Sequence, residues 1–377
     1  MDYLVRHKDV LGLAYLSAVG ALFFNLQPVM VGALADVYGF DEQALGTIVA
    51  AGLLSSFAVL CSAYFWAGKV SLHKAVPIGL GLGVISQGML AFADSYQTLV
   101  ASFICLGAAM PILFAPTLIA LGQSSEPQRA FGIAITVQVL LASVGIYVIP
   151  AWIFPVAAIG GIAVFFAGMM LLGFLALMLV EVSARTSRPG SVGVTRYRLS
   201  VACFAGMAVY FFGINGAFAF LERMGKATGL AAEQVGFSLS LSLLVGVAGS
   251  LAATRFGRLS TRRALMISSL GYMAFLVLMS QERSFPGFLL ALCLFNVGWN
   301  FSLPFLMTVT ANADPSGRFL ALLPAAQTLG GALGPMLAGT LLVSSGEAGV
   351  HAQLAVAALV AFAGFLWVDS KLNPILR

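Results

Sequence analysis

Long uninterrupted apolar runs constrain this chain more than any other feature. The segments 156–180 and 287–311, for example, contain no charged residue. A helix needs about 20 apolar residues to cross the hydrocarbon layer of a bilayer, whereas a barrel strand alternates apolar and polar residues over about ten. Only helices and closed barrels satisfy their own backbone hydrogen bonds in lipid. The runs therefore predict an all-α integral membrane protein.

The overall composition agrees with a bilayer as the solvent. Only 9% of the residues are charged and 60% are hydrophobic, whereas a soluble domain has about 25% charged residues. The net charge of +5 comes from short basic clusters between apolar runs, which argues against nucleic acid as a partner. The four cysteines lie inside apolar runs without metal-binding spacing. We expect neither a metal site nor a cofactor.

Polar breaks divide the chain into twelve expected transmembrane spans, so both termini should lie on one side of the membrane. The expected spans are 10–35, 43–67, 74–94, 97–122, 129–152, 156–180, 199–221, 232–254, 262–280, 287–311, 318–343 and 351–369. Sixteen of the 19 lysines and arginines then fall on the side of the termini. The positive-inside rule predicts cytoplasmic termini in a plasma membrane, which is the inner membrane in a bacterium.

The chain is expected to contain two bundles of six helices each. Residues 1–181 should form the first bundle and 199–377 the second, with 182–198 as a basic cytoplasmic linker. A shift of 189 or 190 positions aligns features of the two halves. Asn25 aligns with Asn215, and Gly68 aligns with Gly257. These matches occupy corresponding places in the topology, which favours a duplicated six-helix unit and pseudo-symmetric bundles.

With these features the chain resembles the major facilitator superfamily over its whole length. The family motif Gly-x-x-x-Asp-Arg-x-Gly-Arg is weak after the second span and clearer after the eighth, where Thr254 replaces the acidic residue. In the family that acid helps to hold one conformation, so its replacement weakens the usual gating network. The residues assigned to cytoplasmic gating motifs by this resemblance are Gly68, Lys69, Arg129, Arg255, Gly257, Arg258, Asp314 and Arg318.

The resemblance also implies a substrate cavity lined by spans 1, 4, 7 and 10, with contributions from spans 5 and 11. The candidate cavity residues are Phe24, Asn25, Gln27, Gln138, Tyr210, Asn215, Asn296, Trp299, Asn300 and Gln327. Aromatic faces with a few amides suit a small neutral or weakly polar solute, aromatic or amphipathic in character. Each amide could instead link helices to one another. Asn25 and Asn215 are the preferred solute contacts.

No charged residue or histidine lies in the middle third of any expected span. A fully anionic solute would need a Lys or Arg there, so sugar phosphates, nitrate and dicarboxylates are disfavoured. Asp36, Glu222 and Arg223 are the candidates for proton coupling, and Glu222 is preferred because Arg223 and partial burial could tune it. A solvated helix end is the competing interpretation for Glu222.

Small residues at spacings of four, including Gly330 and Gly334 in span 11, should let helix backbones approach closely. Residues typical of an enzyme active site are lacking in the spans. The favoured function is therefore secondary transport by alternating access, by a monomer, with protons as the candidate coupling ion. A drug or lipid exporter working by proton antiport is one alternative. A membrane receptor or sensor that does not transport is the other.

Overall fold

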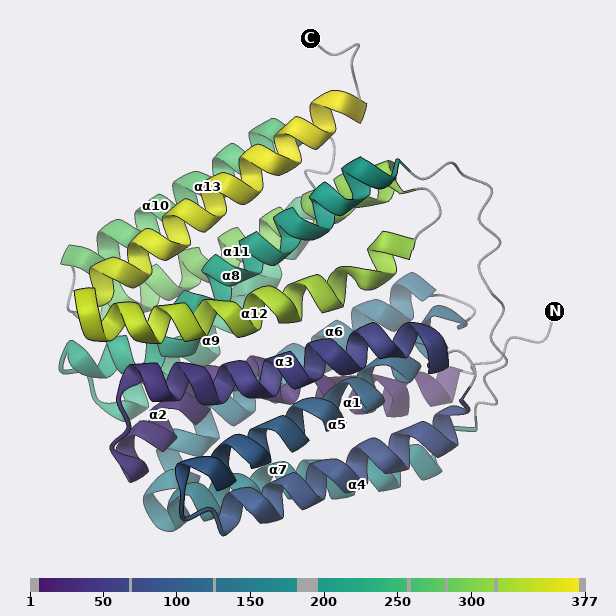
Figure 1. Ribbon diagram of the computed structural model, residues 1–377, viewed down its shortest axis with the longest axis vertical. Coiled ribbons are helices and arrows are strands. Elements are labelled where there is room, and N and C mark those ends of the chain that lie inside the picture. The colour runs from purple at the N-terminus through teal and green to yellow at the C-terminus, as the bar shows by residue number, and fades with distance from the viewer. Residues whose placement is uncertain are drawn as a thin grey trace. The chain divides into compact units, whose positions relative to one another are not determined.

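The computed structural model describes residues 7–67, 70–124, 127–181, 196–255, 259–281, 284–314 and 318–372. Helices make up most of these residues (Figure 1), and no strand element occurs among them. The α-helices are α1 (His7–Asn25), α2 (Gln27–Tyr38), α3 (Glu42–Trp66), α4 (Leu72–Ala91), α5 (Tyr96–Gly122), α6 (Pro127–Val148), α7 (Phe154–Met178), α8 (Tyr197–Ala227), α9 (Ala232–Arg255), α10 (Thr261–Gln281), α11 (Phe285–Ala313), α12 (Arg318–Ser345) and α13 (Glu347–Leu372). A short π-helix, Ile149–Ile153, joins α6 to α7.

The helices account for the twelve predicted spans. Ten segments of the described chain are long and apolar enough to cross a membrane, and the bent pair α1 and α2 provides an eleventh. One of the ten, Arg129–Met178, has 50 residues, about twice the length that one crossing requires. It contains the π-helix and Ala158, whose φ of 45° is not helical, so it provides two spans and brings the total to twelve.

The first span departs from the prediction of one continuous helix. It bends by 48° between α1 and α2, where Leu26 has φ −96° and ψ 9°. Pro28 follows two residues later and has no N–H to donate to the carbonyl of Phe24, one turn earlier. The proline therefore explains why the helix is interrupted at this point.

The seventh span is longer than the predicted 199–221, because α8 continues to Ala227. Glu222 and Arg223 are therefore inside the helix, whereas the prediction placed them at its end. The predicted span ended at residue 221 because the next two residues are charged. A helix can nevertheless continue as long as these side chains find partners, and the partners are described below.

The chain divides into two compact units, and the helices of each pack in the same pattern. The first unit comprises Met1–Gly39 and Ala51–Arg188, and the second comprises Phe40–Ala50 and Pro189–Arg377. In the first unit α1 contacts α5, α6 and α7, and α4 contacts α5 and α7. The corresponding helices of the second unit make the same pairs, since α8 contacts α11, α12 and α13, and α10 contacts α11 and α13. The units are thus pseudo-symmetric six-helix bundles.

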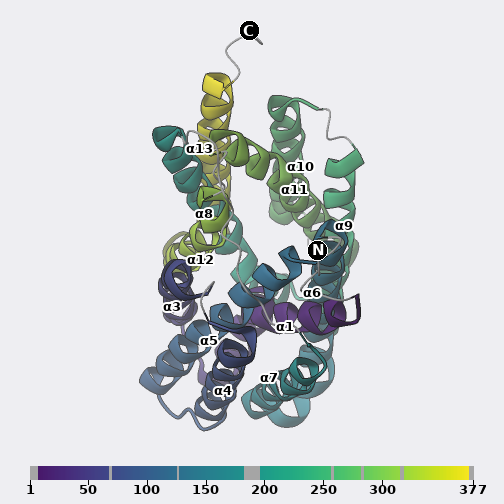
Figure 2. The ribbon, with the colours of Figure 1, turned by 90° about the vertical axis from the view of Figure 1, so that its right-hand side faces the viewer.

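The second unit has two groups of helices (Figure 2). Helices α8, α12 and α13 form one group and α9, α10 and α11 form the other. The beginning of α3 also belongs to this unit. The predicted bundle limits, 1–181 and 199–377, remain a prediction, and most of the predicted linker 182–198 lies outside the described residues.

Helices α8 and α12 meet at the glycines where close approach was predicted. A Cβ atom on Gly330 would lie 2.0 Å from the carbonyl oxygen of Ala208, and one on Gly334 would lie 2.3 Å from that of Phe212. From α13, Gln353 donates its Nε2 hydrogens to the carbonyl oxygens of Phe212 and Gly334, both at 3.0 Å. The prediction of close approach at these glycines is confirmed, and a side-chain amide ties the third helix to the contact.

Replacing Gly330 with alanine should test this contact. The added methyl group must push α8 and α12 apart, and such overpacking costs about 1–3 kcal/mol. We expect Gly330→Ala to lower the melting temperature of the purified protein by several degrees. Gly364→Ala is the matched control, because a Cβ on Gly364 in α13 meets nothing within 4 Å. Equal melting temperatures for the two variants would contradict the described packing.

Candidate functional site

An aromatic cluster surrounds Trp299 inside the second unit. The indole ring of this α11 residue lies 5.8 Å from the rings of both Phe211 and Phe218 on α8, and 6.3 Å from Phe295 on its own helix. All three contacts are edge-to-face, the geometry that aromatic quadrupoles favour. The four side chains are buried. The structure thus brings the predicted Trp299 together with phenylalanines from two helices.

Asn215 lies on the same stripe of α8 as the two phenylalanines. It follows Phe211 by four residues and precedes Phe218 by three, so the three side chains leave the helix on one face. The side chain is fully buried, and neither Oδ1 nor Nδ2 has a hydrogen-bond partner. An unpartnered amide destabilises the interior of a protein. The hydrocarbon layer contains no water that could hydrogen-bond with it instead. Asn215 is the least satisfied predicted residue of this unit.

The other two predicted asparagines of α11 have partners. Asn296 donates from Nδ2 to the Oγ of Ser242 on α9 at 3.0 Å and to the carbonyl oxygen of Leu292 at 3.2 Å. Its Oδ1 accepts no hydrogen bond. Asn300 donates from Nδ2 to the carbonyl oxygen of Asn296 at 2.9 Å. Asn296 therefore links α11 to α9, as the alternative interpretation of the amides proposed.

Tyr210 belongs to a hydroxyl network in the interior of the second unit. Its hydroxyl group lies 2.5 Å from that of Tyr272 on α10 and 2.6 Å from the Oγ of Ser302 on α11. Ser302 also lies 3.1 Å from the carbonyl oxygen of Trp299, to which its hydroxyl can donate. The network joins α8, α10 and α11 and reaches the backbone of Trp299. It favours a positioning role for Tyr210, and sequence reasoning missed Tyr272 and Ser302.

The predicted residues of the first unit lie around the break in its first span. Gln27 is fully buried at the start of α2, and both of its amide atoms lack a hydrogen-bond partner. Asn25 and Phe24, at the end of α1, are partly exposed. On α6, Gln138 donates from Nε2 to the Oγ of Ser17 on α1 at 3.3 Å. Among these residues Gln27 has the unpartnered buried amide, whereas the sequence favoured Asn25.

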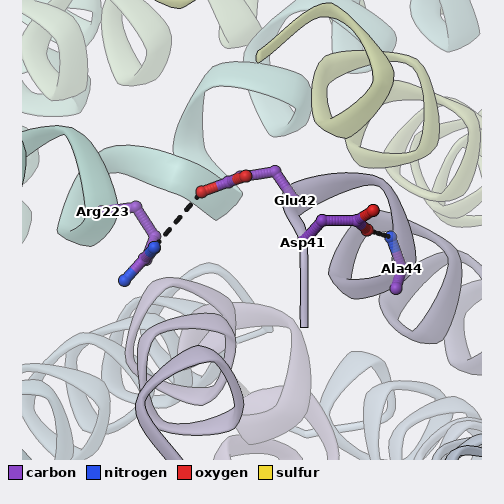
Figure 3. A network of polar contacts seen from close by, with 4 residues as sticks. All are labelled: Asp41, Glu42, Ala44 and Arg223. Atoms are coloured by element: carbon purple, nitrogen blue, oxygen red, sulfur yellow. Dashed lines mark hydrogen bonds and ion pairs between the residues drawn. The ribbon is translucent and has the colours of Figure 1, made fainter. Parts of the chain in front are cut away.

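Four charged side chains form two ion pairs near the end of α8. Glu222 is 5% exposed, and its Oε1 lies 2.8 Å from the Nζ of Lys226, one turn later. Arg223 points to the beginning of α3, where its Nη2 lies 3.2 Å from the Oε1 of Glu42 (Figure 3). The prediction used Arg223 to tune Glu222, but the described ion pair of Glu222 is with Lys226. Burial also makes a solvated helix end an unsuitable description of Glu222.

Most of the remaining coupling and gating candidates are exposed or lie outside the described residues. Asp36 is exposed on α2, and Arg129 and Arg255 are exposed on α6 and α9. Asp314 is buried and accepts a hydrogen bond from the backbone N–H of Phe319 at 2.7 Å. It therefore stabilises the start of α12, a local role the motif did not indicate. Gly68, Lys69, Gly257, Arg258 and the side chain of Arg318 lie outside the described residues, and Gln327 is partly buried on α12.

We looked for metal-binding clusters in the part of the chain that the structure describes. In these residues no group of three His, Cys, Asp or Glu side chains could hold a metal ion. The candidate residues around Trp299 and Asn215 offer aromatic surface, uncharged amides and hydroxyl groups. Such a set can bind a solute by stacking and hydrogen bonding.

A family model described as Major Facilitator Superfamily matches residues 13–318 of the chain. No match was found among curated proteins. Among solved structures, a variant of the nucleoside transporter NupG has a TM-score of 0.77 at 12% identity, with 98% of this chain and 100% of that chain covered. The D-xylose–proton symporter has a TM-score of 0.72 at 15% identity, with 98% and 97% covered.

A bacterial homologue of the human lysosomal transporter Spinster, in an inward-facing and unoccupied conformation, is also similar. Its TM-score is 0.69 at 13% identity, and 97% of both chains is covered. Identities this low support a common fold and leave the substrate open.

The ion pair between Glu42 and Arg223 should contribute modestly to stability. Both side chains are about 30% exposed, and partly exposed pairs contribute up to about 1 kcal/mol. A double-mutant cycle of Glu42→Gln and Arg223→Gln, read from melting temperatures, should give a coupling of that size that decreases with added salt.

Asp41→Asn is the control for this cycle. Asp41 accepts the backbone N–H of Ala44 at 2.8 Å at the start of α3 (Figure 3), and asparagine caps helices about as well as aspartate. This variant should melt like the wild type and should show no coupling to Arg223. A coupling between Glu42 and Arg223 that is zero at low salt would contradict the described pair.

Proposed function

The chain belongs to the Major Facilitator Superfamily, and we propose that it moves a small neutral or weakly polar organic solute by alternating access. As a member of this family it is a multi-pass membrane transporter rather than an enzyme. The solute is proposed to be aromatic or amphipathic. The assignment of individual residues to solute contact is part of the same proposal.

The aromatic cluster around Trp299, with the unpartnered amide of Asn215 beside it, is the observation that carries this proposal. Phenylalanine and tryptophan rings offer large apolar faces, and a carboxamide offers one acceptor and two donor hydrogens without a charge. The segments 211–218 and 295–302 contain no charged residue. A solute with a full charge would therefore lose its hydration without gaining a counter-ion.

The other proposed contacts extend this uncharged set. They are Phe24, Asn25, Gln27, Gln138, Asn296, Asn300 and Gln327, with Tyr210 as a support for Trp299. Gln27 is the strongest of them, because its buried amide is unpartnered. Two of the similar solved structures are named for a nucleoside and for D-xylose, which are uncharged molecules, in keeping with a neutral solute.

The orientation proposed for the chain rests on its charges. Most lysines and arginines flank the spans on the side of the termini, which supports cytoplasmic termini in a plasma membrane, the inner membrane in a bacterium. We further propose a monomer that couples transport to protons through Glu222. This carboxylate is the buried acid of α8, it lies on the same stripe as Asn215 seven residues away, and Lys226 supplies a counter-charge one turn later.

Counterflow in proteoliposomes tests the proposed transport. Vesicles loaded with an unlabelled neutral aromatic solute should accumulate the labelled form without any ion gradient. Trp299→Ala should reduce this exchange strongly, because truncating a central aromatic contact typically costs 2 kcal/mol or more of binding, about 30-fold. An absence of solute-dependent flux across a broad panel of neutral solutes would refute the proposal. If deletion of the protein instead raised the intracellular accumulation of hydrophobic dyes, the exporter alternative would be favoured.

Replacing Glu222 tests the proposed coupling. Glutamine keeps the shape of the side chain but cannot bind and release a proton. We expect Glu222→Gln to abolish uphill accumulation driven by a pH gradient while counterflow continues. Glu233→Gln, at an exposed position at the start of α9, should leave both activities at the wild-type level. Unchanged uphill accumulation in Glu222→Gln would show that coupling lies elsewhere.

A further inference from the structure

We propose that Asn215 and Trp299 recognise a planar ring that carries an N–H donor and a C=O acceptor side by side, as in a lactam. The inference rests on the proposed function and specifies the chemical class of its solute. It requires that the carboxamide of Asn215 bind the donor–acceptor edge while the aromatic cluster holds the ring face.

The first step is the unused hydrogen-bonding capacity of Asn215. Its side chain is 0% exposed, and both its oxygen and its nitrogen lack partners. A buried amide of this kind destabilises the protein unless another molecule pairs with it. Asn296, also fully buried, uses its nitrogen for two hydrogen bonds within the bundle. The two asparagines therefore differ in their hydrogen bonding. Both the donor and the acceptor of the Asn215 amide are available for a solute.

The second step is the geometry of the donor and acceptor groups of Asn215. A carboxamide presents its acceptor oxygen and a donor hydrogen side by side in one plane. A group with the complementary pair forms two parallel hydrogen bonds with it, as asparagine does with the edge of adenine. A ketone or an ether would satisfy only the donor and would leave the oxygen of Asn215 unpaired in a dry environment. Sites with buried polar groups reject such incomplete partners.

The third step is the position of the amide among the rings. Phe211 and Phe218 flank Asn215 on α8, and both rings touch the indole of Trp299. A ring bonded to Asn215 by its edge would lie in the plane of the amide, next to the aromatic side chains that neighbour Asn215 on α8. The aromatic rings contact one another in this structure, so the solute ring must replace one of those contacts when it binds.

Support for the helix around Trp299 comes from the hydroxyl network of Tyr210. Tyr210, Tyr272 and Ser302 connect three helices and reach the backbone oxygen of Trp299. This arrangement links the α11 backbone at Trp299 to α8 and α10. The turn of α11 that carries the indole is therefore tied to two neighbouring helices, and the ring itself contacts Phe211 and Phe218.

Thermal unfolding of the protein without solute is the first test. Leucine has nearly the shape of asparagine, so Asn215→Leu removes an unpartnered amide and should keep or raise the melting temperature. Asn296→Leu breaks the hydrogen bond to Ser242 and should lower it. A clear loss of stability in Asn215→Leu would show that this amide has a structural partner, a helix or a buried water, and would overturn the inference.

Binding of matched probes is the second test. Uracil and 2-pyridone carry the lactam edge, whereas 1,3-dimethyluracil and N-methyl-2-pyridone keep the ring but lack the N–H. The lactams should raise the melting temperature of the wild type, and their apparent affinity should be about 10- to 100-fold higher than that of the methylated forms, as expected for one or two hydrogen bonds. Asn215→Leu should abolish this preference. No shift with either lactam, or an equal response to the methylated forms, would overturn the inference.

Failure of this inference is distinguishable from failure of the proposed function. If neutral solutes without a lactam edge show counterflow that Asn215→Leu leaves intact, the chain is still a carrier of neutral solutes, but Asn215 does not select them. If no solute shows counterflow, the proposed function itself fails.

Discussion

Lipid cannot hydrogen-bond to a protein, and the rest of this structure depends on that constraint. Every backbone group of a span must be satisfied within its helix, and every polar side chain must find a partner inside the bundle. Ser302, Tyr210 and Tyr272 satisfy one another, and Glu222 lies against Lys226. Against this background the unpartnered amides of Gln27 and Asn215 are conspicuous, because the solvent offers them no alternative.

The same constraint explains how the helices pack. Apolar side chains gain little from leaving lipid, so helix association depends on close contact and on hydrogen bonds between helices. Gly330 brings α12 against the backbone of α8, and Gln353 adds two hydrogen bonds at the same place. Contacts of this type hold one group of helices in the second unit, while the hydroxyl network of Tyr210 joins α8 to the other group.

Much of the fold could be predicted from the sequence, because length, hydropathy and charge each act on whole segments. The spans, the repeat and the close approach at Gly330 follow from such patterns. The partners of individual polar residues could not be predicted, since they depend on the rotation of each helix about its axis. Glu222 was expected beside its sequence neighbour Arg223, yet consecutive residues on a helix point about 100° apart. Lys226, one turn later, forms an ion pair with Glu222.

Aligned positions in the two halves of the chain do not always have the same structural environment. Asn25 and Asn215 align in the two halves, but position 28 is a proline and its counterpart at position 218 is a phenylalanine. The proline interrupts the first span, so Asn25 ends α1 partly exposed and Gln27 becomes the fully buried amide of that half. In α8 the helix continues and the phenylalanine packs on Trp299. The difference at this one position thus accompanies an unpartnered amide two residues further along in the first half and an aromatic contact in the second.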